Sequence, residues 1–117
     1  MVAVVEDDAP YRAAVQRLLH SAGFSALVFG SAEEFLNSGQ QQQTGCLIAD
    51  IRMPGMSGLD LQAKLNAEHC LIPTIFVTAH GDEKMRLQAL RAGAVKFLTK
   101  PFDACTLLEA VRVALQD

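Results

Sequence analysis

The sequence lacks any apolar run long enough to span a membrane, and its N-terminus lacks the basic start and long apolar stretch of a signal peptide. These absences predict a cytoplasmic protein without membrane contact. An excess of positive charge is also missing, because ten Lys and Arg against thirteen Asp and Glu give a formal net charge of −3. Since nucleic-acid backbones are bound by clustered basic side chains, we expect no direct nucleic-acid contact by this segment.

Cysteine is scarce, and no C-x-x-C pair occurs. Cys46, Cys70 and Cys105 are odd in number and stand in apolar surroundings. We therefore expect buried free thiols in a reducing compartment, not disulfides or metal ligands. Half of the 117 residues are hydrophobic and a fifth are charged, which predicts one globular domain over 1–117.

Short apolar runs alternate with helical patterns along the chain. Each run has the length of a buried strand, and each helical segment begins after a capping residue. The four glutamines at 40–43 predict a mobile connection between two such elements. The predicted strands are 2–5, 25–29, 46–49, 74–77 and 95–98, and the predicted helices follow Asp8, Ser31, Ser57, Asp82 and Asp103, the first ending at Gly23 and the fourth at Gly93.

Five β–α units in succession predict an α/β fold, with a parallel sheet covered by helices on both faces. Because crossover connections are right-handed, few topologies remain. We expect the flavodoxin-like, doubly wound (βα)5 fold with a five-stranded parallel sheet in the order 2-1-3-4-5. In this fold the ligand crevice lies at the carboxyl ends of strands 1 and 3.

Polar side chains follow four of the predicted strands, and the carboxyl ends of parallel strands meet at one edge. Capping of a helix explains Asp8, but no cap requires Glu6 or Asp7. Carboxylates gathered at one edge would repel one another unless a cation intervened, and oxygen ligands suit Mg²⁺ or Mn²⁺. The polar residues at the strand ends are Glu6, Asp7, Asp8, Asp50, Thr78, Thr99 and Lys100.

The charges at this edge favour phosphoryl chemistry. Three carboxylates (Glu6, Asp7 and Asp50) balance one Mg²⁺ and the ammonium of Lys100, so a dianionic phosphoryl donor meets no net negative charge.

Four segments together resemble the receiver domain of bacterial two-component response regulators. They are VVEDD (4–8), LIADIRMPGMSG (47–58), VTAHG (77–81) and GAVKFLTKPF (93–102), in order and at the proper spacing. The segments RMPGMSGLDL and HGDEKMRLQALRAGAVKFLTKPF resemble those of the branch whose receivers precede helix-turn-helix (LuxR-type) transcription domains. The resemblance implies a sensor histidine kinase as phosphoryl donor, a homodimer in the phosphorylated state, and control of a transcriptional output domain.

The resemblance also implies a role for individual residues. Glu6 replaces the more usual Asp, and its longer side chain would reach the metal through water, so we expect Asp7 to contribute more. The resemblance implies that Asp50 is the phosphoacceptor and that Glu6, Asp7, Asp50 and the backbone carbonyl of Arg52 are metal ligands. It implies that Lys100 and Thr78 contact the phosphoryl group and that Thr78 and Phe97 are the switch residues. It also implies a cis peptide bond between Lys100 and Pro101, and tuning of phosphoryl lifetime by the side chains of Arg52 and His80.

Three other interpretations compete with this one. A haloacid-dehalogenase-type phosphatase needs an acid two positions after its nucleophile, where this chain has Arg52. An FMN-binding flavodoxin-like module needs a phosphate cradle after the first strand, where residues 6–8 would repel the phosphate. A receiver-like module that is never phosphorylated is disfavoured by the intact set of Asp50, Thr78 and Lys100. We expect a stoichiometric phosphoacceptor, not an enzyme, that assists its own phosphorylation and dephosphorylation.

Overall fold

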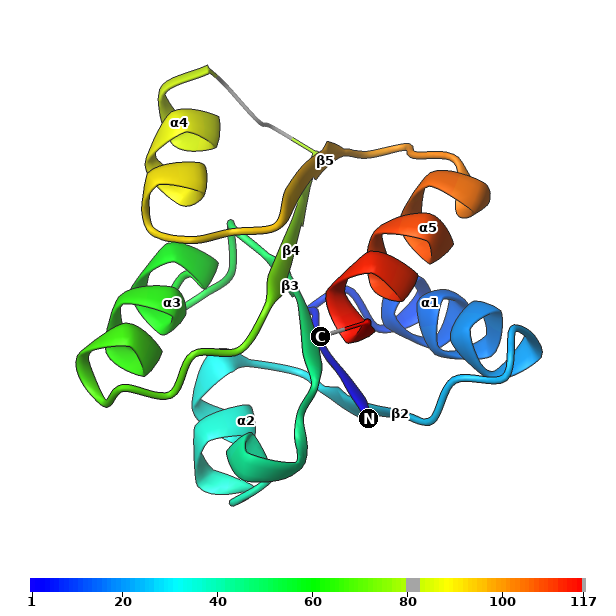
Figure 1. The fold of residues 1–117 in the computed structure, drawn as a ribbon, viewed down its shortest axis with the longest axis horizontal. Helices are drawn as coiled ribbons and strands as arrows, with labels where there is room; N and C mark the ends of the chain where they lie inside the picture. Colours follow the sequence, from blue (N-terminus) through cyan, green and yellow to red (C-terminus); the bar gives the residue numbers. More distant parts are fainter. Residues whose placement is uncertain (80–82, 117) are drawn as a thin grey trace.

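A parallel β-sheet forms the centre of the computed structural model, which describes residues 1–79 and 83–116 (Figure 1). Every neighbouring pair of strands is parallel. The predicted strand order 2-1-3-4-5 is confirmed. The strands are β1 (Val2–Val5), β2 (Ala26–Phe29), β3 (Cys46–Asp50), β4 (Thr74–Thr78) and β5 (Lys96–Thr99).

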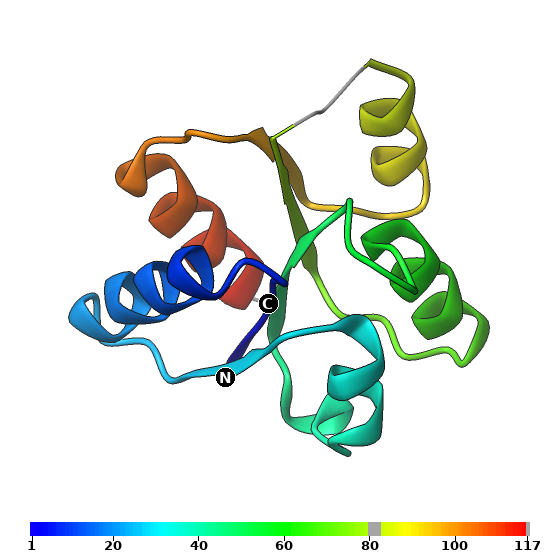
Figure 2. The ribbon, with the colours of Figure 1, turned by 180° about the vertical axis from the view of Figure 1, so that it is seen from behind.

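Helices cover both faces of the sheet. Helices α1 (Ala9–Ser21) and α5 (Ala104–Leu115) lie on one face, and α2 (Ala32–Asn37), α3 (Gly58–Ala67) and α4 (Glu83–Arg91) lie on the other (Figures 1 and 2). This is the doubly wound arrangement predicted from the alternation of elements. None of the helices within the described ranges is long and apolar enough to cross a bilayer.

Capping side chains fix where the helices begin. The carboxylate of Asp8 accepts a hydrogen bond from the backbone of Tyr11, and Ser31 and Asp103 cap α2 and α5 in the same way. Ser57 forms a reciprocal capping box with Asp60 at the start of α3. These four predicted caps are confirmed, whereas the predicted cap at Asp82 lies outside the described residues.

The strands are buried on both faces, as a parallel sheet between two helix layers requires. Val4, Ile48 and Ile75 face α1 and α5, and the intervening residues face the other three helices. On α5, Leu107 and Val111 form part of a buried stripe within this core.

Within the glutamine run, Gln41–Gln43 is a 3₁₀ helix in which the side chain of Gln41 donates to the carbonyl of Leu36. That this connection is mobile stays a prediction. The prediction that all three cysteines are buried is wrong. The three cysteines are free, and Cys46 is buried, but Cys70 is only half-buried and Cys105 is exposed. Cys105 lies in the first turn of α5 outside the buried stripe, so its apolar neighbours in sequence do not cover it.

Candidate functional site

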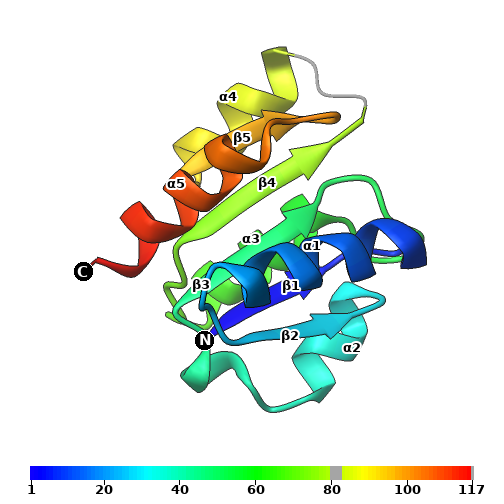
Figure 3. The ribbon, with the colours of Figure 1, turned by 90° about the vertical axis from the view of Figure 1, so that its right-hand side faces the viewer.

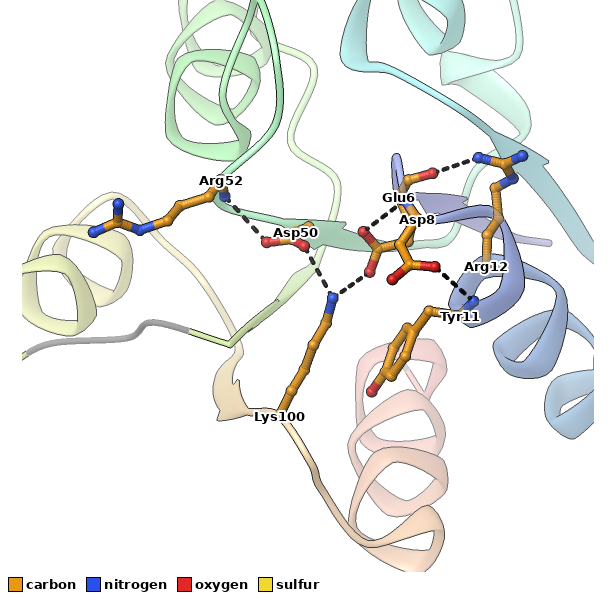
Figure 4. A network of polar contacts seen from close by, with 7 residues as sticks. All are labelled: Glu6, Asp8, Tyr11, Arg12, Asp50, Arg52 and Lys100. Atoms are coloured by element: carbon orange, nitrogen blue, oxygen red, sulfur yellow. Dashed lines mark hydrogen bonds and ion pairs between the residues drawn. The ribbon is translucent and has the colours of Figure 1, made fainter.

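The carboxyl ends of β1, β3 and β5 bring acidic and basic side chains together. All the strands run in one direction, so the residues that end them lie at one edge of the sheet (Figure 3). Glu6 follows β1 directly, Asp50 is the last residue of β3, and Lys100 follows β5. Figure 4 shows the side chains of these three residues pointing toward one another. The convergence predicted from the strand ends is therefore present.

Lys100 bridges two carboxylates. Its ammonium nitrogen lies 2.5 Å from Oε1 of Glu6 and 3.0 Å from Oδ2 of Asp50 (Figure 4). The Glu6 side chain is 2% exposed and that of Lys100 is 14% exposed. One partly buried cation thus partly neutralises two buried carboxylates, and such pairing offsets the cost of burying charge.

A third carboxylate completes an acidic cluster. One oxygen from each of Glu6, Asp7 and Asp50 lies within 4.8 Å of the others, and Asp7 is the exposed member. Three carboxylates and the single ammonium of Lys100 leave a charge of −2, which one divalent cation would cancel. Hard oxygen ligands of this kind fit Mg²⁺ or Mn²⁺.

The pKa values of the buried groups reflect this crowding. Burial raises the pKa of Glu6 to about 7; the hydrogen bond from Lys100 opposes this rise, and the negative charge of Asp50 adds to it. Burial lowers the pKa of Lys100, but hydrogen bonds to Glu6 and Asp50 outweigh burial and raise that pKa above its ordinary value. The ammonium is therefore charged at neutral pH. Its single positive charge is shared among the carboxylates of the cluster and does not neutralise all of them.

Local backbone contacts hold Asp50 in place. Its Oδ1 accepts a hydrogen bond from the backbone N–H of Arg52, at 3.1 Å. The backbone N–H of Gly58 donates to the carbonyl of Ile51, which packs the start of α3 against the end of β3. A Cβ at Gly58 would lie 2.4 Å from the carbonyl oxygen of Asp50, so this close approach requires glycine.

The two predicted switch residues lie on the adjacent strands β4 and β5. Thr78 is fully buried at the end of β4, one position beyond the residue that pairs with Asp50. Its carbonyl accepts a hydrogen bond from the backbone N–H of Lys100. Phe97 is half-buried and packs into the core formed with α2, α3 and α4. The Lys100–Pro101 peptide bond is cis.

The side chain of Arg52 points away from the acidic cluster. Figure 4 shows this direction of the side chain. Its Nη2 lies 3.9 Å from the sulfur of Met85 on α4. His80, the other residue predicted to tune phosphoryl lifetime, is outside the described residues. Thr99 is exposed at the end of β5.

Sequence reasoning missed two neighbours of the cluster on α1. The ring of Tyr11 lies beside Lys100, with the ammonium 4.2 Å from the ring centroid. The guanidinium of Arg12 donates to the backbone carbonyl of Glu6 at 2.7 Å. The sequence placed both residues near the site, in the first turn of a helix that begins there, but no pattern predicted these two contacts.

The fold and the site together define a class: a flavodoxin-like α/β domain with an acidic, lysine-bridged pocket at the carboxyl edge of its sheet. Residues 2–112 match the family described as the response regulator receiver domain. The chain belongs to this family.

Individual relatives agree with this assignment. The chain is 46% identical to nodulation protein W of Bradyrhizobium diazoefficiens over 116 residues, which cover 99% of this chain and 51% of that protein. It is 40% identical to the transcriptional regulatory protein FixJ of Azorhizobium caulinodans, covering 97% of this chain and 54% of the relative. The solved structure of the response regulator StyR superposes with a TM-score of 0.91 at 48% identity, covering 98% of this chain and 58% of StyR. The chain thus spans about half the length of these relatives.

Proposed function

We propose that this chain is a phosphoacceptor domain, 1–117, in which Asp50 receives a phosphoryl group. The observation that supports the proposal is the bridge from Lys100 to Asp50 and Glu6, in which a partly buried ammonium lies 3.0 Å from a carboxylate oxygen of Asp50. Phosphoryl transfer depends mainly on positioning and on neutralising the charge of the phosphoryl oxygens. A cation held by two carboxylates supplies both.

We propose a transfer step in a single displacement. A carboxylate oxygen of Asp50 forms a bond to phosphorus while the bond from phosphorus to the donor breaks, and the electron pair of that bond leaves with the donor. Lys100 then pairs with one oxygen of the phosphoryl group and remains beside Glu6. The hydroxyl of Thr78 donates a hydrogen bond to another of these oxygens. Asp50 needs no general base, because a carboxylate oxygen is itself the nucleophile.

The acidic cluster fits a divalent cation. Glu6, Asp7 and Asp50 would hold Mg²⁺ or Mn²⁺, together with the backbone carbonyl of Arg52, and Asp7 would contribute more than Glu6. When bound, such an ion neutralises charge on the phosphoryl oxygens. The fit rests on the three converging carboxylates and on their uncompensated charge.

The partners of the domain follow from its family. We propose a sensor histidine kinase as the phosphoryl donor, with phosphorylation in the cytoplasm. The name of the relative FixJ describes a transcriptional regulator. An output domain of the helix-turn-helix type is the corresponding proposal for the full protein here, without nucleic-acid contact by the receiver itself.

Phosphorylation would be transmitted through Thr78 and Phe97. When the Thr78 hydroxyl turns toward the phosphoryl group, it vacates space that the half-buried ring of Phe97 fills, so α4, β5 and α5 change their surface. This face would form the homodimer. Amide-shift mapping with and without beryllofluoride tests the switch, and changes confined to the surroundings of Asp50 would contradict it.

The experiment for the phosphoacceptor role is labelling with acetyl phosphate or phosphoramidate, with Mg²⁺ and with EDTA. We expect stoichiometric, Mg²⁺-dependent labelling of the wild type and none of Asp50→Asn. Asp60→Asn is the matched control, because Asp60 is an exposed carboxylate in the capping box of α3, and it should label normally. Labelling of Asp50→Asn at the wild-type level would overturn the assignment.

The same experiment separates the alternatives. A receiver-like module without phosphorylation would not label. A phosphatase would turn over the donor repeatedly, but Arg52 stands where its acid would be, and its side chain points toward Met85. An FMN module would bind flavin, yet Glu6 and Asp7 occupy the position of its phosphate cradle.

A further inference from the structure

An aromatic ring forms one side of the environment of Lys100. The ammonium nitrogen lies 4.2 Å from the ring centroid of Tyr11, within the range of a cation–π interaction. The other contacts of the same ammonium are the carboxylates of Glu6 and Asp50. Lys100 is therefore held by two anions and by the face of a neutral ring.

The ring itself is held from two directions. The backbone N–H of Tyr11 donates to Asp8, which fixes the first turn of α1 at the site. Its ring also packs edge to face on Phe102, with centroids 6.0 Å apart and an interplanar angle of 74°. Because Phe102 comes two residues after Lys100, the ring links the start of α1 to the segment that carries the lysine.

The hydroxyl of Tyr11 takes no part in this arrangement. In Figure 4 the phenol oxygen points away from Glu6 and Asp50. The ammonium of Lys100 lies over the ring of Tyr11. The relevant property is therefore the ring face, which phenylalanine would also supply.

We propose that Tyr11 is a positioning residue for phosphoryl transfer, whose ring keeps the ammonium of Lys100 beside Asp50. This inference rests on the proposed phosphoacceptor role. A lysine side chain has four rotatable bonds, and its freedom must be lost before the ammonium can meet a phosphoryl oxygen. A third carboxylate could also restrain Lys100, but it would repel the dianionic donor, whereas a neutral ring does not.

The test is the rate constant of labelling by acetyl phosphate at saturating Mg²⁺ in variants of the full chain. We expect Tyr11→Leu to slow labelling about threefold to tenfold, the loss expected for one partly buried cation–π contact. Tyr11→Phe should retain most of the wild-type rate. Phe24→Leu is the matched control. Phe24 packs against the same hydrophobic core as Tyr11, but it lies beyond the C-terminal end of α1. The labelling rate of this variant should equal that of the wild type.

A double-mutant cycle distinguishes positioning from a merely structural role. In a Lys100→Met background, Tyr11→Leu should have no further effect on the rate, because the ring has no ammonium to hold. An equal loss in both backgrounds would overturn the proposal. Labelling of Tyr11→Leu at the wild-type rate would also overturn it, without touching the phosphoacceptor role. If the wild type takes up no phosphoryl group, both proposals fall.

A measurement on the wild type covers the case in which Tyr11→Leu does not fold. The methylene protons beside the Lys100 ammonium should show a ring-current shift in the NMR spectrum of the wild type and of Tyr11→Phe. Ordinary lysine shifts in both proteins would overturn the proposal.

Discussion

Gly58→Ala places a methyl group where the backbone of β3 leaves no room. The added Cβ would meet three backbone atoms, of which the carbonyl oxygen of Asp50 is 2.4 Å away and the Cα of Ile51 is 3.1 Å away. Because these atoms belong to the backbone, the start of α3 or the end of β3 must move. Overpacking of this kind costs about 1–3 kcal/mol.

Helix propensity predicts the opposite sign for the same substitution. Alanine at a helical position is favoured over glycine by about 1 kcal/mol at most, and Gly58 is the first residue of α3. The clash is with immobile atoms, so we expect it to dominate and to lower the free energy of unfolding by about 2 kcal/mol. For a domain of this size, that corresponds to a midpoint about 8 °C lower.

Urea and thermal unfolding of Gly58→Ala measure this effect, with Gly30→Ala as the control. A Cβ at Gly30 meets only the flexible ends of Glu34 and Arg12, at 3.3 and 3.4 Å, so that variant should stay within about 0.5 kcal/mol of the wild type. A Gly58→Ala protein as stable as the wild type would refute the reasoning. Such a result would mean that the backbone at the end of β3 moves at little cost in free energy, and that Asp50 is not rigidly placed.

Three further outcomes are expected. Without metal, Asp50→Asn should unfold at a free energy about 1 kcal/mol higher, since one repelling carboxylate is removed; a lower value in urea titrations would contradict this. Free Mg²⁺ at tenfold its Kd should stabilise the wild type by about 1.4 kcal/mol in thermal scans. Asp7→Ala should lose almost all of this stabilisation, and Glu6→Ala should lose less. The reverse ranking would show that the ligand roles are misassigned. Burial raises the pKa of the Cys46 thiol to about 12, so its thiolate is absent below pH 9 and thiol reagents should modify exposed Cys105 first; equal rates would refute this.

The sheet was predictable because each strand is a short apolar run buried on both faces. The observed strands β3 and β4 each end one residue later than predicted. Asp50 and Thr78 are polar, so they fall outside the apolar runs, yet both still pair with the neighbouring strand. The caps were predictable because Ser57 and Asp103 act on backbone groups two or three residues away. Local chemistry of this kind is visible in a sequence.

The site was predictable only in part. Parallel strands share an edge, so the meeting of Glu6, Asp50 and Lys100 follows from topology. The ring of Tyr11 has no such rule, since its contact with Lys100 depends on the orientation of α1 against the segment after β5. The burial of Cys105 was misjudged for a related reason, because apolar neighbours in sequence do not determine which face of a helix is covered.

The most direct test of the central claim is the position of the phosphoryl group. After labelling with acetyl phosphate and Mg²⁺, reduction with borohydride converts a phosphorylated aspartate to homoserine, which peptide mass spectrometry locates. We predict homoserine at position 50 alone, in proportion to the label. Homoserine at Asp7 or another carboxylate, with Asp50 unmodified, would contradict the account.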